Sequence, residues 1–107
     1  MKPPSIVLND RGAEVQFDGV RQWSLEWPNV REIAIEVHVF ADVGYSEAFW
    51  RITGPGVEFG APVELVVGAD EFNSRLFSFP GFDHEAYGRA REAEAIAKPG
   101  LFVCWRA

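Results

Sequence analysis

Asp83, His84 and Glu85 are adjacent candidates for the base, the nucleophile and the orienting group that a hydrolase or transferase requires. We favour a structural interpretation instead. Asp83 stands where a helix N-cap is expected, and His84 at the next helical position would point largely to solvent. The sequence therefore predicts no catalytic residue, and a small enzyme that uses His38 or His84 is the third hypothesis for function.

A second set of residues, Glu36, His38 and Glu47, combines an imidazole with two carboxylates of the kind that bind metal ions. Glu36 and His38 are two residues apart on a predicted strand and share a face, but a metal site needs three or four converging ligands. Pairing of Glu36 with Arg51 on a solvated sheet face is the simpler interpretation. We expect neither a metal nor a cofactor.

Cys104 is the only cysteine in 107 residues, so no disulfide can form within the chain. It lies on a predicted strand with no adjacent base, and we interpret it as a small buried hydrophobe. A reducing, cytoplasmic location is expected. The apolar run before Asn9 contains only three residues, 6–8, which is too short for a signal peptide, and no stretch reaches membrane-spanning length.

The chain is acidic, with 16 Asp and Glu against 10 Lys and Arg and a formal net charge of -6. This balance argues against nucleic acid as a partner, because phosphate binding requires clustered basic side chains. Negative charge suits a basic protein partner, although it also simply keeps a small domain soluble. The length and a hydrophobic content of 48% predict one packed domain over residues 1–107.

Alternating apolar and polar residues predict strands over 32–40 and 47–52, which we interpret as a hairpin. If its turn is the dipeptide Val43-Gly44, Glu36 lies opposite Arg51, whereas a shift by two residues would keep the faces and change the partners. Shorter strands are predicted elsewhere. They cover 6–8, 15–17, 23–27, 57–59, 63–67 and 101–105.

Helical spacing replaces this alternation after residue 68. Phe72, Leu76 and Phe79 define a first helix that ends at Pro80, and a second helix follows Asp83. The second helix carries an apolar stripe formed by Tyr87, Ala90, Ala93 and Ile96. We therefore predict an α+β fold, an antiparallel sheet of about six to eight strands with the two consecutive helices near the C-terminus packed on one face.

The other face of the predicted hairpin places aromatic residues among charged ones, and it is our candidate interface. If the helices leave this face open, it forms a binding surface; if they or a loop cover it, its aromatic residues belong to the core. Its residues are Glu36, His38, Phe40, Glu47, Phe49 and Arg51.

From Tyr45 onward, the order of features resembles a group of small bacterial single-domain proteins, several of them immunity proteins encoded next to polymorphic toxins. The matching features are a strand with Trp50 and Ile52, a strand ending near Pro62, the helix start Asp70-Glu71-Phe72, the sequence Leu76-Phe77-Ser78-Phe79-Pro80-Gly81-Phe82-Asp83 and the closing Phe102-Val103-Cys104-Trp105. The resemblance implies a compact α+β protein that blocks a toxin by binding it, and it implies no catalytic residue.

The leading hypothesis is therefore a non-enzymatic protein-binding domain, an immunity protein whose acidic surface masks a basic toxin. A self-associating structural or regulatory module, in which Phe40 and Phe49 form a homodimer contact, is the alternative from a different class. Neither hypothesis involves nucleic acid or a membrane.

Overall fold

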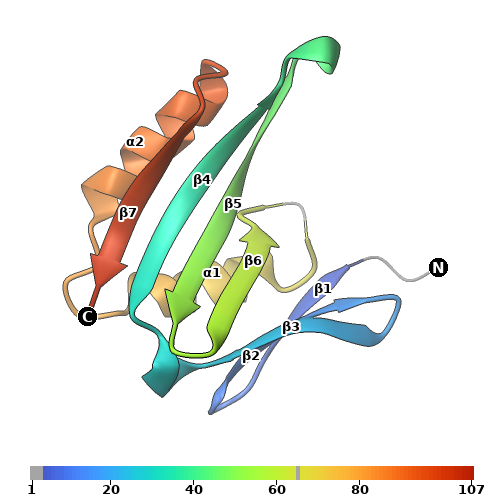
Figure 1. The fold of residues 1–107 in the computed structure, drawn as a ribbon, viewed down its shortest axis with the longest axis vertical. Coiled ribbons are helices and arrows are strands. Elements are labelled where there is room, and N and C mark those ends of the chain that lie inside the picture. The colour runs from blue at the N-terminus through green and yellow to red at the C-terminus, as the bar shows by residue number, and fades with distance from the viewer. Residues whose placement is uncertain (1–3, 65) are drawn as a thin grey trace.

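The computed structural model describes residues 4–64 and 66–107. These residues contain seven β-strands and two α-helices, which confirms the predicted α+β class (Figure 1). The strands are β1 (Ser5–Leu8), β2 (Gly12–Phe17), β3 (Val20–Glu26), β4 (Glu32–Phe40), β5 (Tyr45–Gly54), β6 (Val57–Pro62) and β7 (Gly100–Arg106); the helices are α1 (Ala69–Phe77) and α2 (His84–Ala95).

The strands form two antiparallel sheets, so the prediction of a single sheet is wrong. One sheet has the order β1-β2-β3 and the other the order β6-β5-β4-β7. The chain passes from one to the other through a 3-10 helix, Trp27–Asn29, where Pro28 has no amide hydrogen to donate. The two helices were expected on one face of a continuous sheet. Instead α2 packs on the four-stranded sheet, and α1 also contacts β1 of the three-stranded one.

The predicted strand over 63–67 is also wrong in the part that the structure describes. Residue 65 lies outside the described residues, and Val67 forms only an isolated parallel bridge with Ser5. Pairing with β5 instead extends β6 to Pro62, beyond the predicted range of 57–59.

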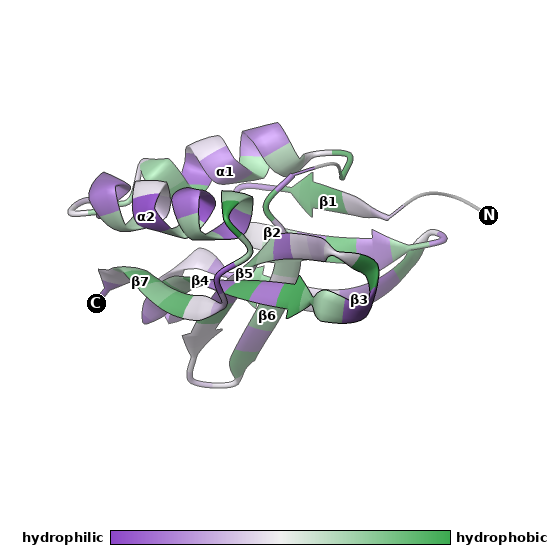
Figure 2. Cartoon of the chain, turned by 90° about the horizontal axis from the view of Figure 1, so that it is seen from above, coloured by the Kyte–Doolittle hydropathy of each residue, from purple (hydrophilic) through white to green (hydrophobic). Residues whose placement is uncertain are grey.

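Both helices lie on the same side of the four-stranded sheet, and neither lies on its other side (Figure 2). The three-stranded sheet stands at one end of these two layers, where β1 contacts α1 and β3 contacts β6. It therefore forms an end wall, and one face of the four-stranded sheet is left without a covering helix. Neither described helix is long and apolar enough to cross a membrane.

The β4–β5 hairpin has the predicted faces but not the predicted register. Glu36 pairs with Phe49 instead of Arg51, a shift of two residues. The loop contains four residues, since a 3-10 turn over Ala41–Val43 is followed by Gly44 in the left-handed conformation. The longer loop moves every cross-strand partner while each side chain stays on its face.

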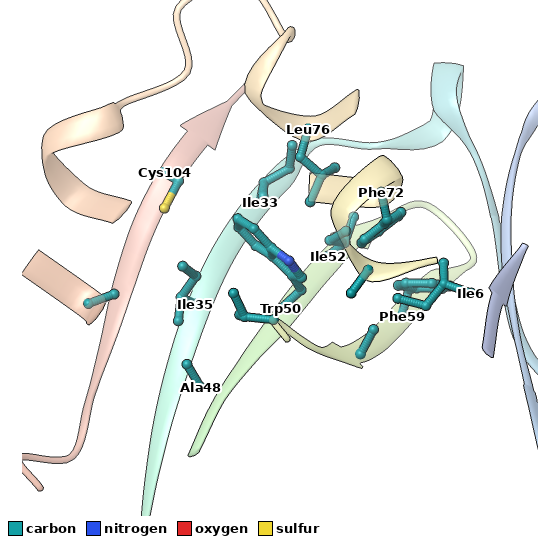
Figure 3. Close-up of a cluster of buried hydrophobic side chains, with 14 of the residues drawn as sticks. Ile6, Ile33, Ile35, Ala48, Trp50, Ile52, Phe59, Phe72, Leu76 and Cys104 are labelled. Atoms are coloured by element: carbon teal, nitrogen blue, oxygen red, sulfur yellow. The ribbon is translucent and has the colours of Figure 1, made fainter. Parts of the chain in front are cut away.

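The core is one cluster of buried apolar side chains between the helices and the two sheets (Figure 3). Ile33, Ile35, Trp50 and Ile52 belong to the four-stranded sheet and are buried. Phe72 and Leu76 of α1 meet them. The helix α2 approaches through small side chains, namely Ala86, Ala90 and Ala93.

The predicted core position of Ile96 is wrong, because its side chain is 67% exposed. The helix α2 ends at Ala95, so the helical stripe is not continued to this residue. The helix α1 ends at Phe77, so Phe79 also lies beyond its helix. Unlike Ile96, Phe79 packs against the core, and its ring lies edge-on to Trp105 with 5.0 Å between ring centroids.

Candidate binding surface

The six residues predicted as an interface lie on the side of the four-stranded sheet that faces away from the helices. We call this surface the open face. Their neighbours along β4 and β5 point into the core, so alternation directs these six outward. Phe40 is 44% exposed, and the side chains of His38 and Arg51 are 45% and 51% exposed. The open face is thus formed by Glu36, His38, Phe40, Glu47, Phe49 and Arg51.

Glu36 is the centre of the polar part of the open face. One carboxylate oxygen lies 3.2 Å from His38 Nε2, and the other lies 3.4 Å from Arg51 Nη1. Glu36 and Arg51 are diagonal neighbours in the observed register, so they still meet although they are not direct partners. These exposed contacts orient the side chains and contribute little to stability.

A row of aromatic rings continues from this polar cluster to the hairpin tip. His38 packs edge-on against Phe49, with 5.2 Å between ring centroids, and stacks on Phe40 at 6.4 Å. Phe40 in turn stacks on Tyr45 at 5.9 Å. Tyr45 is 47% exposed and belongs to this surface. Tyr45 was not predicted as part of the interface, although an aromatic residue beside the hairpin loop and opposite Phe40 indicates such a position.

Tyr45 and Glu47 are joined on the same strand face. The Glu47 carboxylate raises the pKa of Tyr45 by its charge, and partial burial and a hydrogen bond to Glu47 act in the same direction. The phenol therefore stays protonated at neutral pH.

The open face adjoins a groove with a volume of about 640 Å³. Phe17 and Trp23 of the β2–β3 hairpin form one wall, and Phe49 and Arg51 form the other. Strand β6 runs along the groove between them. The remaining lining residues are Val15, Glu36, His38, Trp50, Glu58, Phe59, Gly60, Ala61 and Pro62.

The groove could not be recognised from the sequence, because its walls come from two different sheets. Glu36, His38, Phe49 and Arg51 of the predicted interface line it, whereas Phe40 and Glu47 are not among its lining residues. Four of the six predicted residues therefore share this groove with the β2–β3 hairpin.

The residues considered for catalysis have the structural roles expected of them. Asp83 caps α2 by accepting a hydrogen bond from the backbone N–H of Ala86 at 2.9 Å. His84 is exposed at the start of the helix, with its ring beside Phe77 and Phe82. Asp83 thus caps the helix, and His84 occupies a surface position.

The Cys104 thiol is buried, with 1% of the residue exposed. Burial raises its pKa to about 11, and the negative charge of Asp83 acts in the same direction. The thiol therefore stays protonated at neutral pH, in agreement with its interpretation as a small hydrophobe.

Within residues 4–64 and 66–107, no group of three or more His, Cys, Asp or Glu side chains is arranged to hold a metal ion. Comparison with models of protein families gives no match for the chain. Comparisons with curated protein sequences and with solved structures give no significant match either.

Proposed function

We propose that this chain is a non-enzymatic protein-binding domain and that its binding surface is the open face. The observation that carries this proposal is the uncovered side of the four-stranded sheet, on which an aromatic row is exposed beside charged side chains. Contiguous apolar surface rimmed by polar groups is typical of protein interfaces.

The partner that fits best is a basic protein, because the chain carries a net charge of -6 and opposite charges speed encounter. Together with the resemblance to immunity proteins, this charge supports a domain that neutralises a toxin by covering it. A reducing, cytoplasmic location belongs to the same proposal, since the only thiol, Cys104, is buried and unpaired.

Calorimetry with the product of the adjacent gene tests this proposal. Phe40→Glu places a charge in the middle of the aromatic row, and we expect it to weaken binding at least about tenfold, the effect of losing a buried aromatic anchor. Ile96→Glu is the matched control, because it changes an even more exposed apolar residue at the end of α2. Equal affinity of both variants and the wild type would exclude the open face, and the absence of any binding would exclude this partner.

Self-association is the second candidate, favoured by exposed apolar residues at one end of the open face. Val43 is 74% exposed, and Phe40 and Tyr45 lie next to it at the hairpin tip. A twofold contact would bury Phe40 and Phe49 of the open face, together with this tip, against a second copy. Sedimentation should then show a dimer that Phe49→Glu dissociates, whereas a monomer at high concentration would exclude this role.

A further inference from the structure

The groove beside the open face has features that specify what it binds, and this inference rests on the proposed function. We propose that the groove receives an extended segment of the partner protein in which a large apolar side chain is flanked by Lys or Arg. Four features of the groove support this proposal, namely its walls, its middle, the edge of β6 and the charges at its rim.

The walls supply apolar surface that the fold leaves exposed. Phe17 and Trp23 are 41% and 44% exposed, and their rings meet edge-on with 6.1 Å between centroids. Phe49 and Pro62 contribute apolar atoms from the four-stranded sheet. Exposed aromatic rings on opposing walls suit a large apolar side chain, which would remove both surfaces from water.

The middle of the groove is open because β6 has glycine there. A Cβ atom on Gly60 would meet only the Trp50 carbonyl oxygen, at 3.8 Å, which is ordinary van der Waals contact. The fold therefore has room for a side chain at this position, and glycine leaves that room to the groove. A substitution that adds a side chain at Gly60 would therefore fill the groove without disturbing the core.

The free edge of β6 favours an extended chain as the occupant over a compact small molecule. The Thr53 carbonyl accepts from Arg31 N–H at 2.8 Å, on the β4 side, whereas the Ala48 carbonyl accepts from Val63 N–H at 3.0 Å. The backbone N–H and C=O groups of even-numbered β5 residues therefore point towards β6. Glu58 and Gly60 pair with the odd-numbered residues Thr53 and Arg51, so their own peptide groups point away from β5. Strand β3 contacts β6, but it forms no ladder with it, and within the described chain these peptide groups form no hydrogen bond. An extended peptide could pair with them.

The charges at the groove favour a cationic segment. Glu36 and Glu58 both line it, against a single guanidinium from Arg51. Glu36 already contacts Arg51 and His38, whereas Glu58 is exposed and forms no ion pair with any described residue. A Lys or Arg next to the inserted apolar side chain would supply the missing opposite charge.

Titration of the labelled intact domain with three capped tripeptides, followed by NMR, tests the proposal. The peptides are Lys-Phe-Lys, Lys-Ala-Lys and Glu-Phe-Glu. We expect Lys-Phe-Lys to shift the Trp23 indole N–H and the backbone amides of 58–61. Replacing its Phe by Ala should weaken binding about tenfold, as expected for one aromatic side chain, and replacing its Lys residues by Glu should also weaken it about tenfold.

Matched variants locate the effect. Gly60→Val should weaken Lys-Phe-Lys binding at least about tenfold, because it fills the groove with a side chain the size of a bound group, while Gly60→Ala controls for the loss of glycine. Glu58→Gln should weaken binding about threefold, the effect of one exposed ion pair, and Glu92→Gln on α2 should have no effect.

Equal binding of Lys-Phe-Lys and Glu-Phe-Glu, shifts confined to other surfaces, or no shifts at millimolar peptide would overturn this inference. The proposed function fails separately, when the intact partner binds Phe40→Glu as tightly as the wild type. If Phe40→Glu weakens binding of the intact partner and Gly60→Val does not, the partner binds the open face without inserting a segment into the groove.

Discussion

Trp50 has the largest fully buried side chain of the core, and a hydrogen-bond chain fixes its position. Its indole N–H donates to Asn73 Oδ1 at 2.7 Å, and Asn73 Nδ2 donates to the Val63 carbonyl at 2.8 Å. The indole also stacks on Tyr87, with 5.9 Å between ring centroids. Asn73 thus ties α1 to the central strand and to the segment that follows β6.

Asn73→Leu should lower the free energy of unfolding by about 1 to 3 kcal/mol, because it leaves the indole N–H and a carbonyl without partners. Chemical denaturation followed by tryptophan fluorescence measures the change. Ser74→Ala, at the exposed neighbouring position, is the control and should stay within about 0.5 kcal/mol. Equal stability of the two variants would show that this hydrogen-bond chain does not hold Trp50.

Single residues could be read from the sequence where a local rule applies. Asp83 was predicted as a cap because a short acceptor before a helical stripe is a local signal, and the structure confirms it. Asn73 was not predicted, because its partners are distant in the chain. The only local sign was an amide side chain within a predicted helix, where asparagine is unfavourable unless it bonds elsewhere.

At the scale of elements, Gly44 and Gly88 have opposite roles. Gly44 ends the β4–β5 loop with φ 63 and ψ 36, a left-handed conformation that a Cβ atom disfavours. Gly88 lies within α2, where an added Cβ would meet nothing within 4 Å. Neither position would suffer a clash, so the backbone preference alone decides the effect of a substitution.

Gly44→Ala should therefore destabilise the domain by about 1 kcal/mol, whereas Gly88→Ala should stabilise it by about 0.5 to 1 kcal/mol. Thermal unfolding measures both variants in one experiment. Changes of the same sign would contradict the assigned loop conformation or the placement of α2.

The elements themselves were largely predictable, while their pairing was not. Alternation in 32–40 and 47–52 established which side chains share a face, but faces are unchanged by a shift of two residues, so the register depended on a loop length that was read incorrectly. The division into two sheets also escaped prediction, because strand partners are set by contacts between distant segments. Pro28, in the 3-10 helix Trp27–Asn29, indicated only that a strand ends there and not that the sheet ends with it.

At the scale of the whole molecule, the layers determine which surfaces remain free. Both helices cover one side of the four-stranded sheet, the β1–β3 sheet closes one end, and the open face has no covering helix (Figure 2). The predicted hairpin residues were therefore found on one surface, whereas the groove depends on Phe17 and Trp23 from the other sheet. Alternation could predict the first and not the second.

Cross-saturation NMR of the deuterated domain, bound to its unlabelled partner, tests the open face most directly because it reports which amides lie against the partner. We predict the largest intensity losses within 36–51, on β4 and β5, and none along α2. Losses concentrated on α2, with β4 and β5 unaffected, would contradict it.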